Sequence, residues 1–96
     1  MFPTSLLPIE KEDIPRLHFI HHEVLPAGHA IDRRRQALFQ AMILGNKHHG
    51  KVRITFETAE GWFQVETTVW AAMEDYVLLK GGVYIPARCI HDVDIP

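Results

Sequence analysis

The amino-acid sequence predicts an α+β fold in which one or more N-terminal helical segments precede a five-stranded, strongly bent antiparallel sheet. Apolar residues recur at helical spacing before residue 45, and from residue 51 they alternate with polar residues. The chain has 96 residues, of which 47% are hydrophobic and 23% are charged, so it can form one modest core. We therefore expect a single domain over residues 1–96.

The beginning of the chain divides into a proline-containing arm and a segment whose apolar residues have helix-like spacing. Residues 1–9 contain two prolines and no periodicity, which indicates an extended arm. Residues 10–25 place Leu17, Ile20 and Val24 at helix-like spacing, which predicts a short helix. A strand is the alternative, and it fits less well because it divides these apolar residues between two faces.

A longer helix is expected to complete the helical half, residues 10–45. Asp32 is a plausible N-cap, and Gly45-Asn46 after Leu44 is a typical helix stop. The apolar stripe of this helix must be covered by the rest of the domain. The stripe consists of the pairs Leu38 with Met42 and Phe39 with Ile43, with Ala41 between them.

The β half is expected over residues 51–95. Its second strand is about 11 residues long and should bend or bulge, which favours a small barrel. Ala59-Glu60-Gly61 and a two-residue reversal at Gly81-Gly82 are the predicted hairpin turns. The expected strands are residues 51–57, 62–72, 76–80, 83–85 and a last one through Ile90, Val93 and Ile95. The predicted core residues are Leu38, Met42, Ile54, Phe56, Val65, Val77 and Leu79.

This order of a helix and five glycine-punctuated strands resembles the small barrels of the SH3-like and Sm-like class. The chain from Arg33 onward is also similar to a family of short, uncharacterised bacterial proteins. The resemblance implies a small β-barrel and brings no established activity. The bacterial RNA chaperones of this class carry a Tyr-Lys-His triplet before their last strand, where this chain has Ile85-Pro86-Ala87-Arg88. The motifs of the resemblance are Arg33-Arg34-Arg35, Leu44-Gly45-Asn46, Val65 to Ala71, Leu79 to Gly82 and Ile85-Pro86.

Charge and composition argue against several classes of protein. The net charge is -2, with five basic and five acidic residues up to residue 45, and five basic and seven acidic residues after it. Because phosphate neutralisation supplies most non-specific nucleic-acid affinity, this balance disfavours RNA binding. We find no secretion leader and no run of about 18 apolar residues, so we expect a cytoplasmic protein without a membrane span.

Three consecutive arginines, Arg33, Arg34 and Arg35, fall in the first turn of the predicted helix. There they oppose the helix dipole at about 0.3–1 kcal/mol each when exposed, so something should offset their charge. We expect at least one to form a fork contact with a carboxylate. The triplet is also the candidate site for an anion or an acidic partner. The carboxylates considered as internal partners are Asp32, Glu57 and Glu66.

Histidines and the single cysteine are the candidates for metal binding and catalysis. His18 and His22 share a face of the predicted helix and are weak metal-ligand candidates, because they supply only two ligands. Cys89 and His91 would lie on one side of a strand, but no orienting group is apparent. Cys89, as the only cysteine, also favours a reducing compartment. We expect no enzyme, no metal site and no cofactor.

Trp62 and Trp70 are the candidate interface aromatics. Both lie opposite the core face of their strand and would be ~26 Å apart if that strand were straight. One is expected in the core, and the other could be covered by the N-terminal half or by a second subunit. The sequence therefore favours a non-enzymatic interaction module that contacts a protein partner or itself. Sm-like RNA binding and a histidine metal site are the alternatives.

Overall fold

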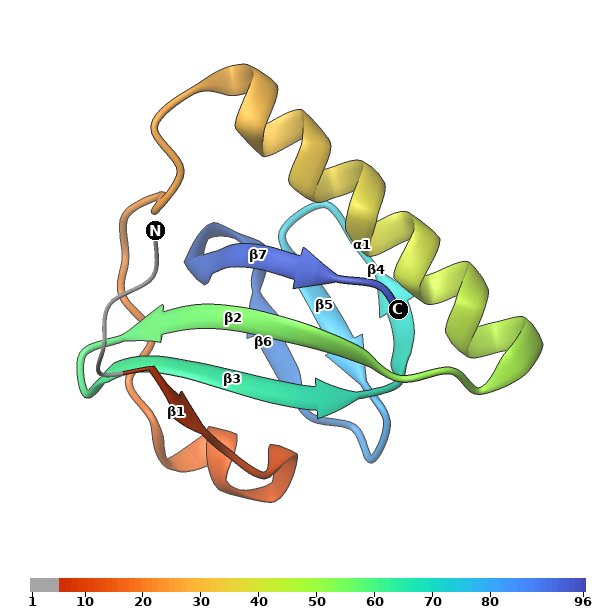
Figure 1. Ribbon diagram of the computed structural model, residues 1–96. Helices are drawn as coiled ribbons and strands as arrows, with labels where there is room; N and C mark the ends of the chain where they lie inside the picture. The colour runs from red at the N-terminus through yellow and green to blue at the C-terminus, as the bar shows by residue number, and fades with distance from the viewer. Residues whose placement is uncertain (1–5) are drawn as a thin grey trace.

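The computed structural model describes residues 6–96 and has an α+β fold with one α-helix and two sheets (Figure 1). The predicted fold class is confirmed at this level. The elements are β1 (Leu7–Pro8), η1 (a 3₁₀ helix, Lys11–Arg16), α1 (Gly28–His48), β2 (Val52–Thr58), β3 (Gly61–Thr67), β4 (Val69–Ala72), β5 (Tyr76–Leu79), β6 (Tyr84–Pro86), η2 (a 3₁₀ helix, Ala87–Cys89) and β7 (Ile90–Asp94).

The strands form two separate sheets instead of the predicted single five-stranded sheet. One sheet has the order β1-β3-β2-β7 and the other has the order β4-β5-β6. Figure 1 shows them as two layers, with α1 along one side. The predicted barrel does not close within residues 6–96, because η2 separates β6 from β7 and β7 pairs only with β2.

The bend expected in the long second strand is confirmed, and it is where the chain passes from one sheet to the other. Thr68 separates β3 from β4, and a bulge follows between Val69 and Ala71. Helix α1 packs closely at this point: a Cβ atom on Gly45 would lie 2.3 Å from the carbonyl oxygen of Val69. Gly45 therefore has a packing role inside the helix, because no side chain fits between α1 and β4.

Helix α1 is longer than predicted at both ends. It begins at Gly28, four residues before Asp32, and the Ala27 carbonyl accepts the first bonds, from the N–H groups of Ala30 and Ile31. It ends after His48, with His49 in the left-handed conformation. The predicted stop at Gly45-Asn46 is wrong, because Gly45 is used for close packing and not for a turn.

The short helix predicted over residues 10–25 is also wrong. The 3₁₀ helix η1 contains Pro15 and ends at Arg16, where the N–H of Leu17 bonds to the carbonyl of Ile14. The chain then runs extended, with a single antiparallel bridge between Phe19 and Thr58. Residues 17–25, which we call the strap, are extended, and their apolar side chains Leu17, Phe19 and Ile20 pack on the core. The helical spacing of apolar residues therefore did not indicate a helix here.

The hydrophobic core lies between the two sheets and α1. Six of the seven predicted core residues are buried, and Met42 is half-buried, with its Sδ accepting a bond from the Ala72 N–H at 3.3 Å. Additional buried residues come from η1, β6, η2 and β7, namely Ile14, Ile85, Cys89 and Ile90. The small-sheet hairpin turns through three residues, Lys80 to Gly82, and not two as predicted.

The N-terminal arm is described only from residue 6. Residues 1–5 of the predicted arm lie outside the described residues. Strand β1 runs parallel to β3, with Leu7 opposite Phe63 and Pro8 opposite Gln64. The arm therefore lies along what would otherwise be a free edge of the four-stranded sheet.

Candidate functional site

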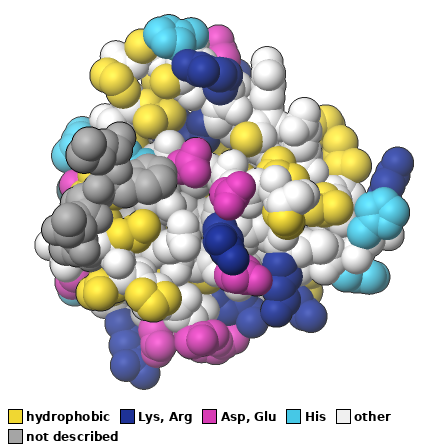
Figure 2. Space-filling view, in the orientation of Figure 1, with side chains coloured by type: hydrophobic (Ala, Val, Ile, Leu, Met, Phe, Trp, Pro, Cys, Tyr) yellow, Lys and Arg dark blue, Asp and Glu magenta, His cyan; other side chains and the backbone are white. Residues whose placement is uncertain are grey.

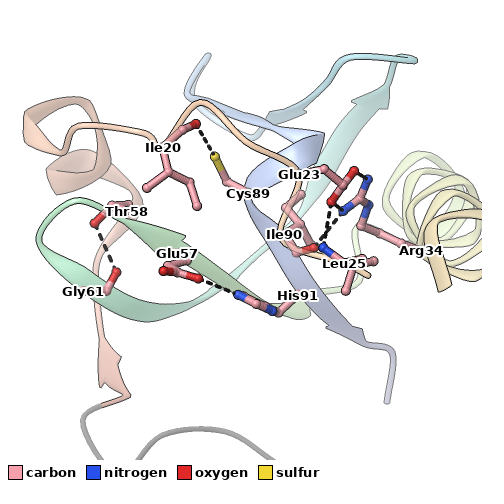
Figure 3. A network of polar contacts seen from close by, with 10 residues as sticks. All are labelled: Ile20, Glu23, Leu25, Arg34, Glu57, Thr58, Gly61, Cys89, Ile90 and His91. Atoms are coloured by element: carbon pink, nitrogen blue, oxygen red, sulfur yellow. Dashed lines mark hydrogen bonds and ion pairs between the residues drawn. The ribbon is translucent and has the colours of Figure 1, made fainter. Parts of the chain in front are cut away.

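The three arginines occupy the second turn of α1 and have different environments. Arg34 is 8% exposed, whereas Arg33 and Arg35 are exposed. The Arg34 guanidinium donates to both carboxylate oxygens of Glu23, from Nη1 to Oε2 and from Nη2 to Oε1 at 2.6 Å each. Its Nη1 also donates to the carbonyl oxygen of Ile90 at 3.1 Å (Figure 3). The expected fork contact is confirmed for one arginine, but its partner is Glu23 and none of the carboxylates considered from the sequence.

This fork joins the loop before α1 to the helix and to β7. The Arg34 guanidinium holds the pKa of Glu23 below its usual range, and the N–H of Leu25 also donates to Glu23. Arg34 is buried and makes three hydrogen bonds within the chain, so it is not free to bind a ligand. Of the candidate anion site, only Arg33 and Arg35 are on the surface.

The two metal-ligand candidates do not share a helix face, because residues 17–25 are extended. The ring and the backbone N–H of His18 bond to the Glu60 carboxylate, and these bonds lower the pKa of Glu60, the backbone bond most. His22 is exposed. Among residues 6–96, no group of three or more His, Cys, Asp or Glu side chains is close enough to hold a metal ion.

Cys89 and His91 face different surroundings. Cys89 is buried in η2, its Sγ lies 3.5 Å from the carbonyl oxygen of Ile20, and burial raises the pKa of its thiol. The His91 ring bonds through Nε2 to Glu57 at 2.9 Å (Figure 3). A thiol with a raised pKa and no base beside it is poorly suited to nucleophilic catalysis.

Trp62 lies on the outer face of the four-stranded sheet. Its indole stacks on the His91 ring with centroids 3.8 Å apart and planes 16° from parallel. Trp62 is half-buried there and is not a core residue. Two further polar pairs occupy this face, Gln64 with Thr55 and Arg53 with Glu66. Figure 2 shows acidic and basic side chains intermingled over this side of the molecule.

Trp70 lies on the outer face of the three-stranded sheet and is 46% exposed. It is the extra residue of the β4 bulge, beside Ala71, which pairs with Leu78 of β5. Leu78 in turn pairs with Tyr84 of β6, so these residues share one face. The opposite face of the same strands, with Val77 and Leu79, is fully buried. The two tryptophans thus lie on different sheets and make no common patch.

Two tyrosines extend the surface around Trp70. Tyr84 is 54% exposed and Tyr76 is 40% exposed. Their ring centroids are 6.0 Å apart with nearly perpendicular planes, and the Phe19 ring lies 6.0 Å from Tyr84 on the other side. Such edge contacts hold aromatic rings in place while leaving their faces accessible. We call Trp70, Leu78, Tyr76 and Tyr84 the outer aromatic face.

Helix α1 continues this surface beyond β4. Phe39 and Ile43 are exposed and lie one turn apart on the helix. Phe39 and Met73, the residue after β4, line the same groove of about 390 Å³. The groove walls carry Arg35 on the helix and Glu74 on the turn between β4 and β5. This groove therefore lies between α1 and the end of β4, with Phe39 and Met73 among its apolar lining residues.

Sequence reasoning identified Trp70 but missed Tyr76, Leu78 and Tyr84. The signal was present, because residues 76–79 are apolar at every position. A strand that is apolar on both faces is typical of a strand covered on both faces. Among the described residues, only the inner face of this strand is covered.

No protein-family model, no curated protein and no solved structure matches the chain. Among residues 6–96, no helix is both long enough and apolar enough to cross a membrane.

Proposed function

We propose that the chain is a non-catalytic protein-interaction module whose binding surface is the outer aromatic face, continued by Phe39 and Ile43 on α1. The observation that carries the proposal is the exposure of Trp70, Tyr76 and Tyr84 on one sheet face, measured among residues 6–96. Large contiguous apolar patches on soluble domains mark interaction sites, because exposed apolar surface costs free energy until a partner covers it.

The composition of the face fits a protein partner. Tryptophan and tyrosine dominate the energetics of protein interfaces because each removes a large apolar area from water with few rotatable bonds. The Tyr84 ring has an edge contact with Tyr76 and a tilted contact with Phe19, and such contacts restrict the rings before binding and so reduce the entropy lost on association.

RNA is the alternative ligand for an aromatic surface, since bases stack on such rings. Backbone recognition would also require a positive surround. The charged residues next to the face are of both signs: Glu74 and Asp75 before β5, Lys80 after it, and Arg35 on the groove wall across from Glu74, whereas Arg34 is already paired with Glu23. This surround favours a polypeptide.

Site-specific photo-crosslinking in the native cell tests the proposal. A photoreactive phenylalanine analogue replaces Tyr84 on the outer aromatic face, and a matched chain carries it at exposed Glu66 on the four-stranded sheet. We expect a protein adduct from position 84 that is lost when Trp70→Ser is added, and no such adduct from position 66. Equal adducts from both positions, or none from position 84, would overturn the proposal.

An RNA titration at two salt concentrations provides the second arm. We expect no micromolar binding to single-stranded or duplex RNA. The informative variant is Arg33→Ala with Arg35→Ala, because Arg34 must be left in place to preserve its bonds to Glu23. Salt-dependent RNA binding that this double variant abolishes would replace the protein-interaction proposal with RNA binding.

A further inference from the structure

Strand β7 is an edge of the four-stranded sheet, and one of its residues turns both backbone groups away from that sheet. β7 pairs only with β2. The Ile9 N–H bonds to the Gln64 carbonyl, so Gln64 turns its backbone groups toward β1 and its neighbours turn theirs toward β2. Because this direction alternates along a strand, Ile54 bonds to β3, and the residues on either side of it bond to β7. Val93, which is opposite Ile54, therefore directs its N–H and C=O to the open edge.

The other strand edges are covered or shorter. β1 lies along β3, and α1 lies so close to β4 that a Cβ atom on Gly45 would meet the Val69 carbonyl. β6 has three residues and ends in Pro86, which has no N–H to donate. Among the described residues, β7, with five residues, is thus the longest edge strand of the two sheets. An unpaired edge is a template for pairing with another strand.

A groove of about 320 Å³ separates this edge from α1. Figure 1 shows β7 as the strand of its sheet that lies nearest to the helix. Val93 lines the groove on the strand side, and Ala30 and Ala37, two turns apart, line it on the helix side. Leu25, at the end of the strap, adds an apolar wall. Because the two alanines have short side chains, the space beside the Val93 backbone stays open.

Arg33 provides an unpaired positive charge in the helix wall of this groove. It is exposed, and none of the ion pairs among residues 6–96 involves it, whereas Arg34 beside it is paired with Glu23. Asp92 also lines the groove. Its side chain alternates with that of Val93, which packs on the core, so Asp92 belongs to the outer side of the sheet. The side of the groove toward α1 is therefore apolar and cationic.

We infer that this groove binds an extended polypeptide segment, which adds as a strand to β7 and places a carboxylate on Arg33. An added strand supplies a donor and an acceptor at the spacing that the two outward backbone groups of Val93 require. Side chains of the added strand alternate, so every second one faces α1. We expect these to be small or apolar beside Leu25 and the alanines, with one aspartate or glutamate beside Arg33. The site lies on a different sheet from the outer aromatic face and does not depend on the proposed function.

Selection from a random-peptide display library on the full chain tests the inference, with the selected peptides then synthesised and titrated as probes. We expect binding that is lost with Val93→Pro and kept with Val93→Ala. Both variants shorten the side chain, but only proline removes the outward N–H, which an edge strand tolerates because that group makes no bond to β2. Arg33→Gln should weaken binding about tenfold. Arg35→Gln, which lines the other groove of α1, is the matched control and should bind like the parent.

Amide hydrogen exchange gives a second readout that requires no substitution. In the chain without peptide, the Val93 amide should exchange rapidly, whereas the amides of Asp92 and Asp94, which bond to β2, should be protected. A saturating concentration of a selected peptide should slow exchange at Val93 about tenfold or more, because its N–H then bonds to the added strand. Unchanged exchange at Val93 would contradict strand addition, and it decides the question if Val93→Pro fails to fold.

The remaining outcomes separate this site from other surfaces. The inference is overturned if the library yields no binder, or if folded Val93→Pro binds the peptides as tightly as Val93→Ala. Peptides lost with Trp70→Ser and unaffected by Val93→Pro would lie on the outer aromatic face, which overturns this inference and supports the proposed function. A parent chain that sediments as a dimer and becomes monomeric with Val93→Pro would make a second copy the occupant of the edge, which also overturns it.

Discussion

The outer faces of the two sheets differ in how their cross-strand rows are composed. On the four-stranded sheet, outward polar groups are opposite one another and bond, as Thr55 does with Gln64 and Glu57 with His91. On the three-stranded sheet, the outward residues are apolar or aromatic, and Leu78 is opposite Tyr84. The rows of the larger sheet are Trp62–Glu57–His91, Gln64–Thr55–Asp92 and Glu66–Arg53–Asp94.

Under the proposed function, the outer face of the four-stranded sheet faces water and the outer face of the three-stranded sheet faces a partner. A sheet with one solvated face normally alternates polar and apolar residues, as β2 and β3 do. Strand β5 does not, although its inner side is already filled by Val77 and Leu79. The apolar residues on its outer side lie outside the core, and under the proposed function a protein partner would cover them.

The largest expected effect is on the shared core beneath both faces. Leu38→Ala should lower the free energy of unfolding by about 2–5 kcal/mol, because Leu38 is buried and its removal leaves a cavity. Phe39→Ala, the neighbouring exposed position, should cost less than about 1 kcal/mol. Urea denaturation of both variants measures the difference. Equal losses would show that Phe39 belongs to the core and not to the interaction surface.

The next effect concerns the fork that ties the strap to α1. Glu23→Gln should destabilise the chain by about 1–3 kcal/mol near pH 7, because Arg34 then loses its buried ionic partner. The folded-state pKa of Glu23 is lowered, so its stabilisation is present above the unfolded pKa of about 4.3 and is lost as pH falls through the folded value. The difference between parent and variant should therefore shrink below about pH 4.

Denaturation of both chains between about pH 7 and pH 2 provides the check. Glu66→Gln removes an exposed pair with Arg53 and should change stability by no more than about 0.5 kcal/mol. A Glu23→Gln deficit that stays constant down to pH 2 would contradict an ionic origin for the contribution of the fork.

On the outer aromatic face, one substitution should weaken binding of the partner while leaving stability nearly unchanged. Trp70→Ser should change the free energy of unfolding by less than about 1 kcal/mol, because nearly half of the side chain is already in water. Binding of the partner should weaken about tenfold, as expected for an interface tryptophan. The yield of the protein adduct from position 84, measured beside thermal denaturation, distinguishes the two effects. A large loss of stability with unchanged association would make Trp70 a core residue.

Local periodicity predicted the β half because β2, β3 and β7 each bury one side, as Ile54, Val65 and Val93 illustrate. Two features depended on distant residues. The division into two sheets occurs at Thr68, where Gly45 packs against Val69 from the other half of the chain. The partner of Arg34 is Glu23, on an extended segment that the spacing of its apolar residues made look helical.

The candidate site was likewise only partly predictable from the local sequence. Trp62 and Trp70 were both predicted as candidate interface residues from strand alternation alone, and the alternation of residues 76–79 could have added Tyr76 and Leu78. That Tyr84 and Phe19 join them depends on strand pairing and on the course of the strap, which the sequence does not encode locally. The helical contribution of Phe39 and Met73 depends in turn on how α1 lies along β4.

The smallest effect is expected from a substitution on the outer face of the four-stranded sheet. It tests whether only the outer face of the three-stranded sheet binds a partner. Arg53→Gln removes a cation whose contact with Glu66 is 3.5 Å long and more than half exposed on both sides. Because solvent screens such a pair, the free energy of unfolding should change by no more than about 0.5 kcal/mol. Binding of the partner should be unaffected, since Arg53 and Trp70 lie on different sheets. The yield of the protein adduct from position 84 in Arg53→Gln beside Trp70→Ser makes the comparison direct. If Arg53→Gln weakened association as much as Trp70→Ser, the paired polar rows would belong to the contact, and the apolar outer face could not by itself account for it.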